Sequence, residues 1–451
     1  MKYLHFIGFM FLLFVVGACN KDKEFVKQDL YANFAVQYPL DTTFRIPQYD
    51  TLRITPTIGG MDEGKQYTYE WKLYVKEGKT QILSTKRNLA QEISLPEGNY
   101  SLQFSVVEKA SGVTALSNIM RLNVTGIYYE GWLVTNNVDN QGKMSFLRTD
   151  GEIISDPLQD ANDKMFPGKA IGSIAVIADG FFNTAVNQIM YFTDRGLTMF
   201  DPASFLQITE TNQNLFAPIS FNSRPAFVLN TFNTDQYFIG NGGLHAAYIP
   251  FGGSDDSKLE TFSSRFSGDY DLYPFIFPDA GGNIFVYDNK GKRFFIGEYY
   301  GRELYSDKAV GKTMLGADKT INSQYLTLLK DGNNYTIATC RLSSTSSTGS
   351  QINEVPFSPI GIDVAPVFAA STEFAIGYFS AGNKIYSVNG VNGNLTLIYT
   401  FPAGSIIGDI QMMKEGTDVN RKLIVGVNNG KSGEVYYLYL GTQGNLNNTR
   451  P

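Results

Sequence analysis

Residues 284–296 read Ile-Phe-Val-Tyr-Asp-Asn-Lys-Gly-Lys-Arg-Phe-Phe-Ile, and this stretch decides the class of fold. An apolar run from Ile284 to Tyr287 meets a turn-forming cluster, and a second apolar run begins at Phe294. Asp, Asn and Gly favour tight turns while β-branched and aromatic residues favour strands, so the stretch predicts a β-hairpin.

The same hairpin pattern recurs along the chain from about residue 127 onward. Successive units begin 41 to 58 residues apart, at Trp132, Met190, Gln236, Asn283, Gln324, Glu373 and Lys422. A strand-rich repeat of about 40 to 50 residues is typical of propeller blades. The sequence therefore predicts a β-propeller over residues 127–451, with seven blades favoured and six or eight left open. A pair of sandwiches is the competing fold, because no WD or kelch signature accompanies the repeats.

Residues 30–125 carry a different pattern, in which short alternating strands are separated by turn residues. One strand places four large apolar residues on a single face, Tyr67, Tyr69, Trp71 and Leu73. About seven such strands predict an immunoglobulin-like sandwich. We expect Trp71 to be a core residue rather than a ligand contact. The whole chain is thus predicted to be all-β.

The beginning of the chain predicts export and lipid anchoring. An uncharged run from Phe6 to Val16 follows Lys2 and is short for a membrane span, as in a secretory signal peptide. The run ends in Val16-Gly17-Ala18-Cys19, which resembles the lipobox of bacterial lipoproteins. We therefore expect residues 1–18 to be removed, Cys19 to be lipidated and residues 19–29 to form a polar tether at the outer membrane. An ordinary signal peptide with a chance cysteine is the alternative.

Composition excludes several classes of protein. The 451 residues are 43% hydrophobic and 18% charged, which argues against wholesale disorder. A net charge of −6 argues against nucleic-acid binding, which needs a basic face. Only two His and two Cys are present, so most catalytic triads and zinc sites lack their residues.

No stretch makes a positive case for an enzyme, a cofactor or a metal. With Cys19 acylated, Cys340 stands alone in a strand-like run, and we expect it to be a buried small apolar residue. His245 follows Asn241-Gly242-Gly243-Leu244, so a surface or turn position is expected. Residues 137–142 faintly resemble a calcium loop but lack the closing acid, so a hairpin turn is favoured there. We predict no catalytic, cofactor-binding or metal-binding residues.

Three motifs resemble one known family of bacterial surface proteins. They are Tyr69-Glu70-Trp71, Pro96-Glu97-Gly98-Asn99-Tyr100 and Gly131-Trp132-Leu133-Val134. In this order, behind a lipobox, they are similar to the PKD-like lipoproteins of Bacteroidota, although the Phe-Gly-Asp-Gly turn of standard PKD domains is missing. The resemblance implies a PKD-like sandwich at the cell exterior. It also implies, as partners, a TonB-dependent importer of the starch-utilisation type and its SusD-like lid lipoprotein.

Ligand contacts are predicted where tyrosines gather near acidic and basic residues in loops: Tyr270, Tyr273, Tyr299 and Tyr300. The resulting interpretation is a lipid-anchored surface protein that captures an oligopeptide or a glycan for an importer. The poverty in Trp favours peptides slightly, because flat aromatic faces are the usual sugar platforms. Two alternatives stay open: a docking subunit of the importer without its own ligand, and a surface hydrolase or lyase.

Overall fold

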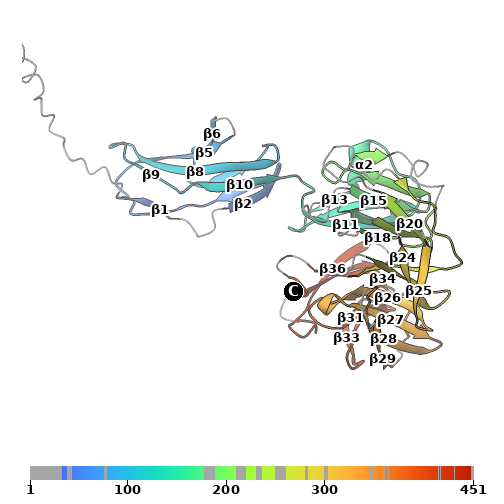
Figure 1. The fold of residues 1–451 in the computed structure, drawn as a ribbon. Helices are drawn as coiled ribbons and strands as arrows, with labels where there is room; N and C mark the ends of the chain where they lie inside the picture. Colours follow the sequence, from blue (N-terminus) through green and yellow to red (C-terminus); the bar gives the residue numbers. More distant parts are fainter. Residues whose placement is uncertain are drawn as a thin grey trace, which may run out of the picture. The chain divides into compact units, whose positions relative to one another are not determined.

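The computed structural model describes residues 33–37, 43–75, 79–176, 188–209, 220–229, 236–248, 261–279, 283–298, 303–344, 349–358, 361–363, 365–414, 416, 418–430 and 432–447. The chain divides into two compact units, Met1–Tyr129 and Glu130–Pro451 (Figure 1). Strands and turns make up nearly all of the described residues, which confirms the all-β prediction. Within these ranges no helix has the length and apolar character needed to cross a membrane. The predicted signal peptide, Cys19 and the tether lie outside the described residues.

The first unit is a small sandwich of antiparallel strands with one parallel pair. Its main sheet has the order β2-β10-β8-β5-β6, with β9 also pairing with β8, and β2 runs parallel to β10. Two short pairs, β1-β4 and β3-β7, complete it. The strands are β1 (Ala35–Gln37), β2 (Thr43–Pro47), β3 (Thr51–Ile54), β4 (Thr57–Gly59), β5 (Tyr67–Tyr74), β6 (Thr80–Ser84), β7 (Leu89–Glu92), β8 (Gly98–Glu108), β9 (Thr114–Leu116) and β10 (Met120–Thr125).

Trp71 lies at the centre of the sandwich core, as the strand alternation predicted. Its side chain is fully buried and packs on Phe104, with 4.5 Å between ring centroids. The indole N–H donates to the carbonyl oxygens of Lys86 and Arg87 at 3.1 and 3.2 Å. A buried indole needs such a partner for its polar edge. Trp71 is therefore a structural residue.

The described part of the second unit forms seven consecutive antiparallel sheets, each built from strands in chain order. The first and last sheets have three strands and the five between them have four. The sheets are β11 (Gly131–Val138), β12 (Gln141–Arg148) and β13 (Ile153–Ser155); β14 (Ala170–Val176), β15 (Gln188–Thr193), β16 (Gly196–Phe200) and β17 (Gln207–Thr209); β18 (Ala226–Leu229), β19 (Gln236–Gly240), β20 (Gly243–Tyr248) and β21 (Thr261–Phe262); β22 (Leu272–Pro278), β23 (Ile284–Asp288), β24 (Arg293–Glu298) and β25 (Glu303–Ala309); β26 (Thr313–Lys319), β27 (Tyr325–Asp331), β28 (Asn334–Arg341) and β29 (Gln351–Phe357); β30 (Phe368–Ala370), β31 (Ile376–Ala381), β32 (Lys384–Asn389) and β33 (Leu395–Thr400); and β34 (Ile406–Met412), β35 (Lys422–Asn428) and β36 (Gly433–Tyr439).

The hairpin predicted from residues 284–296 is present as β23 and β24. Tyr287 lies opposite Phe294 in the register, and every residue of β23 is buried. Asp288 ends β23 with its side chain fully buried. Its carboxylate accepts hydrogen bonds from the backbone N–H groups of Asp271, Lys290 and Gly291 at 2.9, 3.0 and 2.9 Å. The Asp of the turn signal thus fixes the hairpin by satisfying three backbone donors.

Most first strands of the seven sheets contact the first strand of the next sheet. Contacts join β11 to β14, β18 to β22, β22 to β26, β26 to β30 and β30 to β34. Figure 1 shows the sheets following one another until the C-terminal strand β36 returns toward β11, where the ring of Trp132 lies 5.6 Å from that of Tyr437. The described part of the second unit thus consists of seven separate small sheets that follow one another in chain order.

Most of the core of the second unit lies between consecutive sheets. One apolar cluster joins Phe285 of β23 to Leu329 of β27, and another joins Ile385 of β32 to Val425 of β35. Burying one large apolar side chain contributes about 1.5–3 kcal/mol. Face-to-face packing of neighbouring sheets therefore stabilises the unit, which explains why the central strands read as continuous apolar runs.

Candidate functional site

Tyr270 has a packing role in the structure. Its side chain is 6% exposed, and its hydroxyl donates to the carbonyl oxygen of Phe266 at 2.6 Å. The Arg265 guanidinium covers the ring at 3.9 Å from its centroid. These contacts explain why a tyrosine occupies this position. The role of Tyr270 in ligand binding stays a prediction. Tyr299, Tyr300 and Cys19 lie outside the described residues.

The one free cysteine of the described chain and the lone histidine after Cys19 are both enclosed. Cys340 is fully buried as expected, and burial raises the pKa of its thiol to about 12. His245 differs from the expected turn position, since it lies within β20 and is 5% exposed. Its Nδ1 is 3.0 Å from the carbonyl oxygen of Ser263, and burial lowers its pKa. The turn is formed by Asn241 and Gly242 and ends before β20 begins at Gly243, so strand pairing carries the imidazole inward.

The calcium-like loop is a hairpin turn between β11 and β12, as favoured from the sequence. Val138 lies opposite Gln141, and the two central residues, Asp139 and Asn140, have φ values of 51° and 62°. Positive φ at both central positions is the signature of a type I′ turn, which Asn and Asp tolerate. Within the described ranges, no group of three or more His, Cys, Asp or Glu side chains is placed to hold a metal ion.

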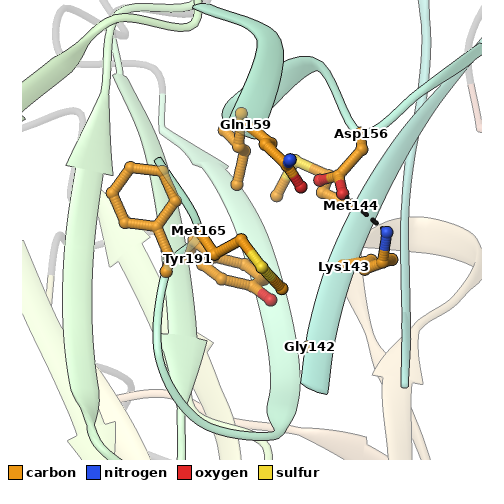
Figure 2. Close-up of a pocket in the computed structure, with 9 residues that line it drawn as sticks. Gly142, Lys143, Met144, Asp156, Gln159, Met165 and Tyr191 are labelled. Atoms are coloured by element: carbon orange, nitrogen blue, oxygen red, sulfur yellow. Dashed lines mark ion pairs between the residues drawn. The ribbon is translucent and has the colours of Figure 1, made fainter. Parts of the chain in front are cut away.

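A small cavity lies between β12, α2 (Pro157–Asn162) and β15 (Figure 2). Its polar groups are Lys143, Asp156, Gln159 and the Tyr191 hydroxyl, and methionine and aromatic side chains complete the lining. Lys143 Nζ is 3.0 Å from the Asp156 carboxylate. The cavity holds about 10 Å³, the space of roughly one water molecule. It is therefore too small for a peptide or a sugar.

Tyr191 gives this cavity an unusual feature. The side chain is 1% exposed, and its hydroxyl has no hydrogen-bond partner among the described residues. Burial, assisted by the Asp156 carboxylate, raises the pKa of Tyr191 well above its ordinary value. Gly142 is required here, because an added Cβ would lie 2.5 Å from the hydroxyl oxygen. One water could satisfy this hydroxyl, and nothing larger fits.

A second polar group of residues lies on and beside the first strands of the sheets. We call it the first-strand cluster: Arg224, Tyr273, Asp318, Asp409, Gln411 and Lys414. Arg224 precedes β18, yet its Nη1 donates to Asp409 Oδ1 on β34 at 2.7 Å. Three sheets lie between these two strands along the chain, so the ion pair joins distant parts of the repeat. The side chains of Arg224 and Asp409 are 50% and 38% exposed, which leaves both charges accessible to solvent.

Asp409 is held in place by its own strand. The register of β34 shifts between Ile407 and Asp409, and such bulges re-aim the side chain that follows. The carboxylate accepts a hydrogen bond from the N–H of Ile410 at 2.9 Å, and Gln411 Nε2 donates to both oxygens at 3.3 and 3.1 Å. The residues of its own strand therefore fix the position of the Asp409 carboxylate, independently of Arg224.

The other ion pair of the cluster is a structural tie. Lys414 Nζ contacts the Asp318 carboxylate and also donates to the carbonyl oxygen of Lys319 at 3.3 Å. Asp318 further accepts from the N–H groups of Lys319 and Ala370, each at 2.8 Å. These bonds connect β26, β30 and the segment after β34. Asp318 is 19% exposed, so its charge is largely used within the fold.

Tyr273 is the one predicted ligand residue that the structure places in this cluster. It lies on β22, half-buried, with its hydroxyl 3.3 Å from the carbonyl oxygen of Leu315. Burial raises the pKa of Tyr273, and the charges of Arg224 and Asp318 act on it in opposite directions. The pairing of Arg224 with Asp409 was not predicted, because 185 positions separate them and neither stands in a motif.

A protein-family model matches the first unit and the beginning of the second. Residues 31–170 match the model of the PKD-like family, which covers the sandwich and the first sheet of the repeat. No curated protein matches the chain.

Solved structures with similar folds include several from Bacteroides. A quinoprotein alcohol dehydrogenase-like protein of Bacteroides thetaiotaomicron is 12% identical over 92% of this chain and 96% of its own, with a TM-score of 0.46. A Lactobacillus plantarum protein is 12% identical over 70% and 93%, with a TM-score of 0.48. An auxiliary nutrient binding protein of B. thetaiotaomicron is 8% identical over 91% and 99%, with a TM-score of 0.33. These likenesses are too distant to assign a function.

Proposed function

We propose that this chain is a lipid-anchored binding protein of the outer membrane, facing the cell exterior, which captures an oligopeptide or a glycan for a TonB-dependent importer. The observation that carries the proposal is the Arg224–Asp409 pair of the first-strand cluster, 2.7 Å apart and half-exposed. Charged side chains that converge from distant strands on a rigid scaffold are typical of binding sites. The cavity at Tyr191, at about one water in size, leaves this cluster as the better candidate.

The second unit would present this cluster as a seven-bladed β-propeller. Three features support the proposal: seven consecutive antiparallel sheets, adjacent first strands and the contact of Trp132 with Tyr437 between the first and last sheets. In a propeller, the first strands line the central channel. Arg224 and Asp409 would then form their ion pair at that channel, where a ligand can reach both.

Anchoring is proposed from the sequence and the family match. The lipobox-like run ending at Cys19 supplies the lipid, and the PKD-like sandwich would act as a spacer between the membrane and the propeller. Confinement beside an importer raises the effective concentration of captured ligand at its mouth. An importer with its lid lipoprotein is therefore the proposed partner.

We propose binding rather than catalysis at this surface. The support is the enclosure of the two groups best suited to nucleophilic or acid–base chemistry. Cys340 is fully buried with its pKa raised to about 12, and His245 is 5% exposed with a lowered pKa. A nucleophile or general base must reach its substrate and titrate near neutral pH.

A pull-down from the native outer membrane in mild detergent tests the partner. The tagged wild-type chain is expected to retain a TonB-dependent barrel and its lid lipoprotein, identified by mass spectrometry. The matched control is Cys19→Ala, which should be released from the membrane and retain neither. Recovery of the wild-type chain alone, even after gentle crosslinking, would remove the importer from the proposal.

A further inference from the structure

Resting on the proposed binding function, we infer that the first-strand cluster takes a short zwitterionic peptide, whose carboxylate binds Arg224 and whose ammonium group binds Asp409. The two side chains already form an ion pair of the same chemistry, with Nη1 and Oδ1 2.7 Å apart. A peptide carries both charges at its ends. The bound peptide therefore replaces the Arg224–Asp409 ion pair with two ion pairs, one at each of its ends. Both side chains keep a partner of opposite charge.

The internal pair opens at small cost. Arg224 is 50% exposed and Asp409 is 38% exposed, and ion pairs at such exposure contribute about 0–1 kcal/mol. Because both side chains are accessible to solvent, opening the pair leaves no buried charge without a partner. A ligand that supplies two fresh ionic contacts can thus displace this one.

Among the described residues, the Arg224 guanidinium uses only one of its nitrogens as a hydrogen-bond donor. Its contact with Asp409 engages Nη1 alone, and its other nitrogens donate to none of the described residues. A guanidinium presents a planar fork that binds a carboxylate through two parallel hydrogen bonds. The carboxyl terminus of a peptide, or an acidic side chain, fits this fork.

Asp409 is built to accept an ammonium group. The Ile410 N–H at 2.9 Å and the Gln411 amide fix the carboxylate, and Gln411 adds an amide that can bond to a peptide carbonyl. Lys414 is engaged with Asp318, so it does not compete for this acceptor. The cluster therefore keeps one cationic and one anionic contact available.

The first-strand cluster offers a neutral sugar fewer favourable contacts than it offers a charged peptide. Neutral sugars depend on exposed flat aromatic faces in addition to hydrogen bonds. Two aromatic side chains of the first strands are engaged within the fold: the Tyr273 hydroxyl donates to the carbonyl oxygen of Leu315, and Phe368 fills the space above Gly316 and Gly377. The described cluster thus favours charge recognition over stacking.

The test uses the full-length lipoprotein in detergent and isothermal titration calorimetry. The probes are the tripeptide Ala-Leu-Ala, its N-acetylated and C-amidated form, and maltoheptaose. We expect Ala-Leu-Ala to bind, the doubly capped peptide to bind about tenfold more weakly and 0.5 M NaCl to weaken binding several-fold. Arg224→Gln and Asp409→Asn should each weaken Ala-Leu-Ala about tenfold. Arg195→Gln, a 74%-exposed arginine in the β15–β16 turn, is the matched control and should leave binding unchanged.

The outcomes separate this inference from the proposed function. Equal binding of capped and uncapped peptide, or no effect of Arg224→Gln, overturns the inference, and the capped-peptide arm needs no variant to fold. Binding of maltoheptaose but not of the tripeptide overturns the inference and supports the binding function. Absence of binding by all three probes overturns the inference, and the membrane pull-down then decides separately whether the importer role survives.

Discussion

The ring of Trp132 on β11 packs against the ring of Tyr437 on β36, with centroids 5.6 Å apart and an interplanar angle of 50°. These strands belong to the first and last sheets of the repeat, so this contact links its two ends. The end sheets have three strands each, and side-chain packing joins them rather than a strand shared between them.

We expect this aromatic pair to stabilise the second unit. A double-mutant cycle with Trp132→Leu and Tyr437→Leu should give a coupling free energy of about 0.5–1.5 kcal/mol in urea unfolding. Leu keeps an apolar side chain at both sites while removing the ring-on-ring contact. The matched control pairs Trp132→Leu with Tyr49→Leu, a tyrosine of the other unit that is 60% exposed, and should show no coupling. Additivity at Trp132 and Tyr437 would contradict a stabilising role of this ring contact.

Asp288 is expected to matter far more for stability than Asp269, an exposed acid that pairs with Lys290 of the same turn. Asp288→Ala removes the acceptor for three backbone N–H groups at a buried position, and should lower the free energy of unfolding by about 2–4 kcal/mol. Asp269→Ala is the control, because that carboxylate is 85% exposed and pairs with Lys290 at the surface. It should change the stability by less than about 1 kcal/mol. The free energy of unfolding of both variants is measured by chemical denaturation. An equal, small loss in the two variants would mean that the turn does not depend on the Asp288 carboxylate.

The fold was largely predictable, and the hairpin at 284–296 shows why. Turn residues and apolar runs act locally, so Asp288 and the strands around it are readable from neighbouring positions. The predicted unit starts at Gln236, Asn283 and Gln324 fall on or beside the second strands β19, β23 and β27. His245 was predicted at a turn or surface position because the turn was assumed to extend to Leu244. In the structure the turn ends at Gly242.

The candidate site was predictable only in part, since it depends on contacts distant in sequence. Tyr273 was singled out by its residue type and loop neighbours. Arg224 and Asp409 were missed, because their meeting depends on the arrangement of whole sheets. When charged residues are spaced irregularly along a repeat, the sequence does not predict which of them will form pairs. Tyr270 looked equivalent to Tyr273 in sequence, yet the backbone carries its hydroxyl inward to Phe266.

Alkaline pH should unfold the second unit cooperatively. Burial raises the pKa of Tyr191, Tyr273, Tyr287, Tyr325 and Tyr378 above the ordinary 10.0. In the unfolded chain these hydroxyls lose their protons near pH 10, whereas in the folded chain they keep them to higher pH. The folded state then binds more protons, so stability is fully present below pH 10 and falls as the pH rises further. Absorbance at 295 nm should show exposed tyrosines titrating first and a second, steep step coincident with loss of tertiary structure. A single smooth titration of all tyrosines in the folded state would contradict the burial described.

The Tyr191 hydroxyl gives the sharpest test of the small cavity. An unsatisfied buried hydroxyl costs about 1–3 kcal/mol, so Tyr191→Phe should leave the stability unchanged or raise it by about 1 kcal/mol. Tyr378→Phe is the matched control, because its equally buried hydroxyl donates to the carbonyl oxygen of Gly444 at 3.0 Å. Losing that bond should lower the free energy of unfolding by about 1 kcal/mol. The two variants are compared by urea unfolding at neutral pH, where both tyrosines are protonated. A loss at Tyr191 as large as that at Tyr378 would show that its hydroxyl is bonded in solution, with a water in the roughly 10 Å³ cavity as the fitting partner.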